Sequence, residues 1–139
     1  MDKEIPTIRA GQGVDSYELG WHKDKLLTVL DQDYTLTDAL DCLIYDKPNI
    51  RFFVAKCDMT LHSIYVYNNF IGRFLDKYEI NTPFQHLEKD FSSTLEYDEM
   101  DSYYSLGDYP DILIYTDSRN ENVANISGFQ IFKMDFTPL

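Results

Sequence analysis

The stretch Asp111-Ile112-Leu113-Ile114-Tyr115-Thr116 decides the fold, together with the run Asn125-Ile126-Ser127-Gly128-Phe129-Gln130-Ile131-Phe132 that follows it. Both runs are short and rich in β-branched and aromatic residues, whereas residues 117–122 between them are all polar. This pattern predicts two antiparallel strands joined by a hairpin loop. Because strand side chains alternate between the two faces of a sheet, we expect Ile112 and Ile114 on one face and Leu113 and Tyr115 on the other.

A similar unit occurs earlier in the chain. The apolar run at residues 50–55 is followed by a polar break around Asp58 and then by a second apolar run at residues 61–67. Ile50, which opens this unit, lies 61 positions before Asp111. The same kind of hairpin is therefore predicted twice.

A second pair of segments has the same spacing. Tyr-Glu-Leu at residues 17–19 lies 61 positions before Tyr-Glu-Ile at residues 78–80. The repeated offset indicates a tandem duplication of a strand-helix-strands unit, with halves at residues 8–69 and 70–135. The alternative is that the two halves contain similar elements by coincidence. At 139 residues the chain is expected to be a single domain, residues 1–139, whose halves share a core.

Two amphipathic patterns predict helices at residues 23–32 and 83–91. Each half then reads as a strand, a helix and two or three antiparallel strands. Two such halves can join their strands into one sheet, with both helices against one face and the other face partly solvated. We therefore expect an α+β fold, an antiparallel sheet with two main helices on one face, and a loop around Gly11 and Gly13.

The two predicted helices begin differently. The first is expected to be poorly capped, because Trp21 and His22 precede it. The second carries the signature of a capping box, with Thr82 as the N-cap, Pro83 at the first helical position and Gln85 at the third.

Composition limits the classes of partner. The formal net charge is −12, and only twelve Lys and Arg residues are scattered along the chain. A nucleic-acid binder needs clustered Lys and Arg, and anionic membranes attract the same kind of cluster, so neither partner is expected. Opposite charges steer association, so a basic protein partner is the natural inference. The alternative is that the acidity only supports solubility.

The chain carries no export signal that we can identify, because residues 1–6 contain no apolar run. No window approaches the ~20 apolar residues of a membrane span. With Cys42 and Cys57 as the two cysteines, we expect free thiols, small residues of the core, and a reducing cytoplasm.

Several short motifs together resemble those of small bacterial immunity proteins, which accompany polymorphic and contact-dependent growth inhibition toxins. The motifs are a Gly-rich loop, a Leu-Gly turn before a helix, Tyr-Pro before an apolar strand, and a last strand ending in Ile-Phe. In this chain they are Ile8-Arg9-Ala10-Gly11-Gln12-Gly13-Val14, Leu19-Gly20, Tyr109-Pro110 with residues 111–116, and Ile131-Phe132.

The resemblance implies a cytoplasmic inhibitor that binds the C-terminal domain of one cognate toxin as a monomer in a 1:1 complex. It implies no catalysis and no cofactor. The doubled strand-helix-strands layout is also similar to that of β-lactamase inhibitory proteins, as an analogy of architecture only.

An acidic, tyrosine-rich segment in the second half is the candidate partner-binding site. No Lys or Arg occurs between Lys89 and Arg119. Tyrosine offers a large, rigid contact area with a polar tip, and carboxylates nearby can pair with the Lys and Arg that a nuclease uses for phosphate. The alternative is a solvated loop with some tyrosines in the core. The predicted binding residues are Glu96, Asp98, Glu99, Asp101, Tyr103, Tyr104, Asp108 and Tyr109.

A weaker copy of this segment lies in the first half. No Lys or Arg occurs between Lys25 and Lys47. The favoured interpretation is a charged connector, and the alternative is a second part of the acidic binding surface. Its acids are Asp31, Asp33, Asp38, Asp41 and Asp46.

No catalytic or metal-binding motif stands out. The three histidines, His22, His62 and His86, lack the spacing of metal ligands, so no metal is expected. An acidic adaptor module and, less favoured, a hydrolase with an acidic cleft are the alternatives to an immunity protein.

Overall fold

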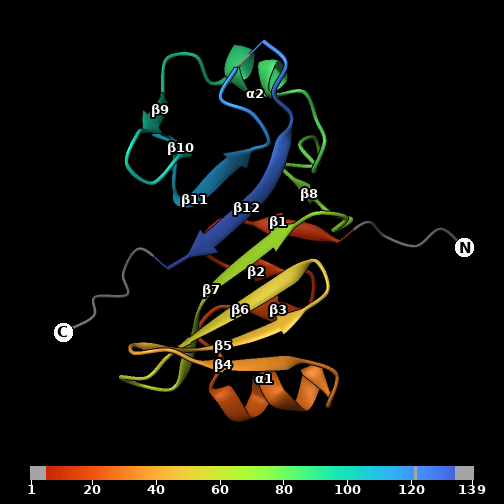
Figure 1. Ribbon diagram of the computed structural model, residues 1–139, viewed down its shortest axis with the longest axis vertical. Coiled ribbons are helices and arrows are strands. Elements are labelled where there is room, and N and C mark those ends of the chain that lie inside the picture. The colour runs from red at the N-terminus through yellow and green to blue at the C-terminus, as the bar shows by residue number, and fades with distance from the viewer. Residues whose placement is uncertain (1–5, 121, 134–139) are drawn as a thin grey trace, which may run out of the picture.

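The computed structural model describes residues 6–120 and 122–133. Its larger layer is an eight-stranded sheet in the order β4-β5-β6-β7-β12-β11-β10-β9, in which all neighbours are antiparallel (Figure 1). The strands are β4 (Thr35–Asp38), β5 (Cys42–Lys47), β6 (Ile50–Ala55), β7 (Thr60–Tyr67), β9 (Leu95–Asp98), β10 (Tyr103–Leu106), β11 (Tyr109–Thr116) and β12 (Ile126–Phe132).

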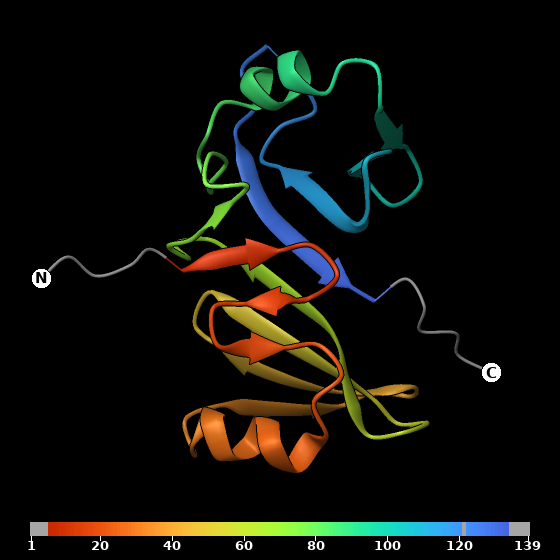
Figure 2. The same cartoon turned by 180° about the vertical axis from the view of Figure 1, so that it is seen from behind.

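The second layer consists of a small sheet and two short helices. The small sheet has the order β3-β2-β1-β8, and its β1–β8 pair is parallel. Figure 2 shows this sheet in front of the middle of the large sheet, with one helix at each end of the molecule. The elements are β1 (Thr7–Arg9), β2 (Gly13–Val14), β3 (Tyr17–Glu18), β8 (Arg73–Phe74), α1 (Lys23–Leu30) and α2 (Phe84–Asp90).

The core lies between the two layers. Tyr17 of β3 packs on Phe52 of β6, with ring centroids 4.6 Å apart, and Phe84 of α2 lies 4.3 Å from Tyr104 of β10. Paired residues form a buried row across five strands of the large sheet. Burial of such apolar side chains is the main source of stability. The row consists of Tyr45, Phe52, Ile64, Ile131 and Ile112.

The predicted alternation in the last hairpin is confirmed. Ile112 and Ile114 are both 0% exposed and face the core. Leu113 and Tyr115 are half-buried and lie on the opposite face of β11. The face of the large sheet opposite the small sheet and the helices therefore carries apolar and aromatic side chains of its own.

The predicted α+β fold with two main helices is wrong. Strand makes up 47% of the structure and helix 12%, and the two helices have eight and seven residues. The loop expected around Gly11 and Gly13 contains strands β1 and β2, and residues 35–38 form the edge strand β4. These strands are too short, or too exposed, to show the alternation on which the sequence prediction depends.

The predicted helix caps are also corrected. His22 does cap α1, because its Nδ1 accepts a hydrogen bond from the backbone N–H of Asp24 at 3.1 Å. The N-cap of α2 is Pro83, and no side chain caps that helix. Thr82, the expected cap, instead accepts a hydrogen bond from the backbone N–H of Glu79 at 3.0 Å.

The elements of the two sequence halves have matching positions. The helices begin at Lys23 and Phe84, 61 positions apart. Strands β4–β7 make one half of the large sheet and β9–β12 the other, and they join at the β7–β12 pair in its centre. Buried residues of both halves belong to one hydrophobic core.

Candidate functional site

The predicted acidic segment occupies β9, β10 and the turn between them. Asp98 Oδ1 accepts hydrogen bonds from the backbone N–H groups of Met100 and Asp101, at 3.0 and 3.1 Å. The N–H of Asp101 is the main cause that lowers the pKa of Asp98, and a hydrogen bond from Tyr103 adds to it. The same bond to Asp98 raises the pKa of Tyr103. Asp98 is therefore an ionised residue that orders the turn.

Three of the predicted binding residues are exposed near it: Glu96, Glu99 and Asp101. Tyr104, in contrast, is 5% exposed and packs between Phe84 and Tyr97, so it belongs to the core. Successive residues of a strand face opposite sides, and Tyr103 and Tyr104 divide accordingly.

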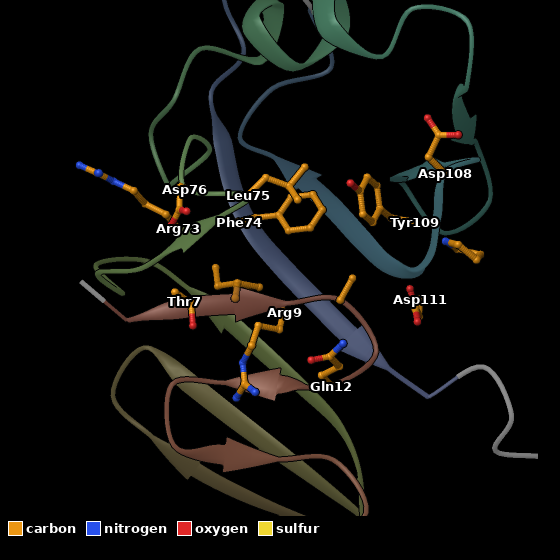
Figure 3. Close-up of a pocket in the computed structure, with 13 residues that line it drawn as sticks. Thr7, Arg9, Gln12, Arg73, Phe74, Leu75, Asp76, Asp108, Tyr109 and Asp111 are labelled. Carbon is orange, nitrogen blue, oxygen red and sulfur yellow. The ribbon is translucent and has the colours of Figure 1, made fainter. Parts of the chain in front are cut away.

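The other two predicted residues lie elsewhere. Asp108 and Tyr109 line a pocket of about 520 Å³ at the seam between β1, β8 and β11 (Figure 3). The ring of Tyr109 packs edge-on against Phe74, with centroids 5.3 Å apart. Two arginines line the pocket, but both are engaged elsewhere: Arg73 pairs with Glu79 and points away, and Arg9 donates to the carbonyl of Asp15 at 2.7 Å. We therefore interpret the pocket as a gap in the packing where β1 and β8 meet β11, and not as a binding site.

Strand register places part of the acidic segment on the face of the large sheet opposite the core. Glu96 pairs with Ser105, which pairs with Leu113, and the row continues across the sheet. Figure 1 looks onto this face, and no described helix or strand lies in front of β7 and β12. The complete row is Glu96, Ser105, Leu113, Gln130, Tyr65, Arg51, Asp46 and Thr35.

Four tyrosines form a continuous cluster on this face. Tyr65 stacks on Tyr67, with centroids 4.9 Å apart, and meets Tyr115 edge-on at 5.3 Å. Tyr115 in turn lies 6.2 Å from Tyr103. The term open face is used below for Glu96, Asp98, Tyr103, Leu113, Tyr115, Gln130, Tyr65 and Tyr67.

A chain of hydrogen bonds fixes the centre of the open face. The hydroxyl of Tyr115 donates to Gln130 Oε1 at 3.0 Å, and Gln130 Nε2 donates to Ser63 Oγ at 3.0 Å. Ser63, which is buried, donates to the carbonyl of Ile131 at 2.9 Å. Burial raises the pKa of Tyr65 and of Tyr115, so both hydroxyls remain neutral at physiological pH. The cluster is therefore preorganised.

One cation of the protein already lies on this face. Arg51 Nε donates to Asp46 Oδ1 at 2.6 Å, and its guanidinium lies 5.9 Å from the ring centroid of Tyr67. The first half thus places a guanidinium between a carboxylate and an aromatic ring. The bond to Asp46 is the main reason that the pKa of Arg51 is raised.

The other first-half acids are exposed around the opposite end of the sheet. Asp38 forms an ion pair with Lys56, so part of this charge is compensated within the protein. The remaining three, Asp31, Asp33 and Asp41, are exposed.

A hollow of about 600 Å³ is lined in part by Ser63 and Gln130, which belong to the chain of hydrogen bonds that holds Tyr115. Both cysteines line it and both are free thiols. Cys57 is exposed and Cys42 half-buried, so the prediction that they are core residues is wrong. Burial lowers the pKa of His62 and raises that of Cys42.

Other features of the described residues are limited. No group of three or more His, Cys, Asp or Glu residues within 6–120 and 122–133 is arranged to hold a metal ion. In the same part of the chain no helix has the length and apolar character needed to cross a membrane.

The sequence prediction missed Tyr65 and Tyr67. Both lie in the apolar run 61–67, which was predicted only as the second strand of a hairpin, with no face assigned to its residues. Their i, i+2 spacing is the signal that places both on the face opposite Ile64 and Val66.

Comparisons with known proteins find a similar fold but no similar family or curated sequence. No known family model matches the sequence, and no curated protein matches it either. The structure is similar to that of the uncharacterized protein yfeY from Escherichia coli, with a TM-score of 0.58 and 11% sequence identity, over 91% of this chain and 98% of that one.

A second similar structure is a cysteine-rich secretory protein from Staphylococcus aureus, with a TM-score of 0.55 and 13% identity. The match covers 96% of this chain and 51% of that one, so this chain spans about half of its length. At these identities the likeness shows a shared fold and leaves function to be argued from the site.

Proposed function

We propose that this protein is a cytoplasmic immunity protein, which binds the C-terminal domain of a cognate toxin and neutralises it without catalysis. The partner is a basic protein, for which a nuclease is the leading candidate, and the complex is 1:1. The observation that carries the proposal is the continuity of exposed acids at the β9–β10 edge with the tyrosine cluster of the open face.

The charge distribution supports a basic partner. The protein carries a formal net charge of −12, and no Lys or Arg belongs to β9, β10, β11 or β12. The charged residues within these four strands are all acidic, and such a surface steers a basic protein toward it and raises the association rate. It repels nucleic acid and anionic lipid for the same reason.

The side chains at this edge suit a protein interface. Tyrosine is enriched among residues that dominate binding energy, because its ring buries a large area at a low cost in conformational entropy. Half-buried rings that already contact one another, as Tyr103 and Tyr115 do, lose little further freedom when a partner covers them.

The proposal is tested by co-expression with the C-terminal domain of the toxin encoded next to this gene. We expect the pair to co-purify as a 1:1 complex and the toxin to lose its lethality. A triple variant, Glu96→Gln, Glu99→Gln and Asp101→Asn, should slow association and reduce its dependence on salt, because these carboxylates are exposed.

Asp98 is left unchanged in this variant, because it orders the turn. The matched control changes Asp31 and Asp33 to Asn, two exposed acids at the other end of the molecule. Survival of the toxin's lethality in the presence of the intact protein, with no complex formed, contradicts the proposal.

A further inference from the structure

We propose that the open face takes an arginine side chain of the partner, with its guanidinium stacked on the ring of Tyr115, beside Tyr103, and paired with Glu96 or Asp98. This inference rests on the proposed function in taking the partner to be a basic protein. It assigns the docking surface to the sheet face itself and not to the acidic turn alone.

The first half of the sheet supplies the precedent. There Arg51 of β6 is held between the carboxylate of Asp46 and the ring of Tyr67. A guanidinium suits this position because it is planar, can stack on a ring and can donate to a carboxylate at the same time.

The second half offers rings and carboxylates near the equivalent position, but its four strands in the large sheet supply no cation. Leu113 of β11 lies in the same cross-strand row as Arg51, and each is on the third strand from the outer edge of its half. Tyr115 lies two residues along the same strand and Tyr103 on the next strand. The acids of β9 lie one strand further out, so that Ser105 separates Leu113 from Glu96 where Arg51 pairs directly with Asp46. Strands β9–β12 contain no Lys or Arg, so none of their own residues provides the cation.

The platform is also rigid. Tyr115 is held by its hydrogen bond to Gln130, and Tyr103 by its bond to Asp98. Tyr65 of the first half closes the cluster from the other side, 5.3 Å from Tyr115. A surface that is ordered before binding favours one geometry of the incoming side chain. The planar guanidinium of arginine suits such a surface better than the ammonium group of lysine.

The experiment uses two probes of equal charge, a nona-arginine and a nona-lysine peptide, with binding measured by calorimetry and mapped by NMR at low and high salt. We expect the arginine peptide to bind about tenfold more tightly and to shift the ring signals of Tyr103 and Tyr115. Tyr115→Ala should remove most of this preference and leave the weaker lysine binding.

The control is Tyr97→Ala, which removes an exposed tyrosine that the register places on the opposite face of β9. A second variant, Leu113→Arg, places a guanidinium of the protein itself at the proposed position and should also abolish the preference for arginine. Equal binding of the two peptides overturns the inference, as does an undiminished preference in either Tyr115→Ala or Leu113→Arg with native circular dichroism.

The same two variants are then tested against the toxin domain. If they bind and neutralise it like the parent, the inference fails while the proposed function stands. If the arginine peptide maps to the open face but the parent binds no toxin, the proposed function fails while the arginine preference of the face stands.

Discussion

The ring of Tyr65 lies directly against Gly128 of the neighbouring strand, where a Cβ atom would come within 2.8 Å of the ring's Cε1 and within 2.9 Å of the carbonyl oxygen of Val66. Gly128 and Tyr67 are cross-strand partners at the β7–β12 junction, so the gap left by the glycine lies where the two halves of the sheet meet. Tyr65 uses that gap to reach both Tyr67 and Tyr115. The tyrosine cluster therefore depends on a residue without a side chain.

Replacing Gly128 by Ala should push Tyr65 out of the cluster. Overpacking of a tightly filled site costs typically about 1–3 kcal/mol, and we expect the free energy of unfolding in urea to fall by that amount. Gly107→Ala is the control, because its nearest neighbour is a Thr94 side-chain atom at 3.2 Å. Equal stability of the two variants, with unshifted Tyr65 ring signals, contradicts the packing argument.

The two faces of β11 should respond differently to truncation. Ile112→Ala or Ile114→Ala removes a fully buried side chain and should cost about 2–5 kcal/mol of unfolding free energy. Leu113→Ala, on the open face, should cost clearly less, because its side chain is only half-buried. Urea unfolding of the three variants measures the difference. Similar losses at Ile112 and Leu113 would mean that the open face is covered in solution.

The strands that could be predicted are those with a long alternating pattern of their own. β6 and β7, like β11 and β12, carry six to eight residues each, and their apolar positions are visible in the sequence. β1 and β8 have three and two residues, and they exist because Thr7 pairs with Arg73 across the chain. No local pattern reports such a contact, so β1, β2 and β8 were not predicted as strands, whereas the two helices of the second layer lie close to their predicted positions.

The candidate site could also be predicted only in part. The run of acids indicated the β9–β10 edge, because such a run can be recognised without knowing which face of the strand each residue occupies. The role of a tyrosine, in contrast, depends on the face it occupies. Tyr103 and Tyr104 are adjacent, yet Tyr103 lies on the open face and Tyr104 packs against Phe84. Tyr65 belongs to the same cluster but comes from the other half of the sequence, so only the β7–β12 pairing brings it there.

Stability should fall in alkali because of buried tyrosines. The hydroxyl of Tyr78 donates to Asp90, and burial together with this bond raises the pKa of Tyr78 far above its usual value. The folded state then keeps its proton at a pH where the unfolded chain has lost it. The free energy of unfolding is therefore expected to be intact below about pH 10 and to decrease as pH rises above that value.

Tyr78→Phe tests this effect, because it removes the titrating group and keeps the ring. The variant should be less stable at neutral pH, where a hydrogen bond to Asp90 is lost, but its stability should decline less steeply in alkali. Urea unfolding as a function of pH, with tyrosinate absorbance as a second signal, measures both. A parent whose stability does not change between about pH 10 and 12 contradicts the expected linkage.

Gly11 and Asp111 provide the sharpest test of how the small sheet is attached to the second half. Gly11 has a φ of +71°, and a Cβ at this position would lie 1.9 Å from Asp111 Oδ2. Gly11→Ala should therefore lose stability twice, about 1–2 kcal/mol from the left-handed backbone and a further amount from the clash.

The two contributions can be separated with a double-mutant cycle. Asp111→Ala shortens the clashing side chain, so the double variant Gly11→Ala/Asp111→Ala should recover the steric part of the loss and keep the backbone part. Unfolding free energies of the four proteins give the coupling, which we expect to be positive and about 1 kcal/mol or more. If the two single losses simply add, the carboxylate does not rest on Gly11, and the first strands are held to the second half by the β1–β8 pair and the shared core without this contact.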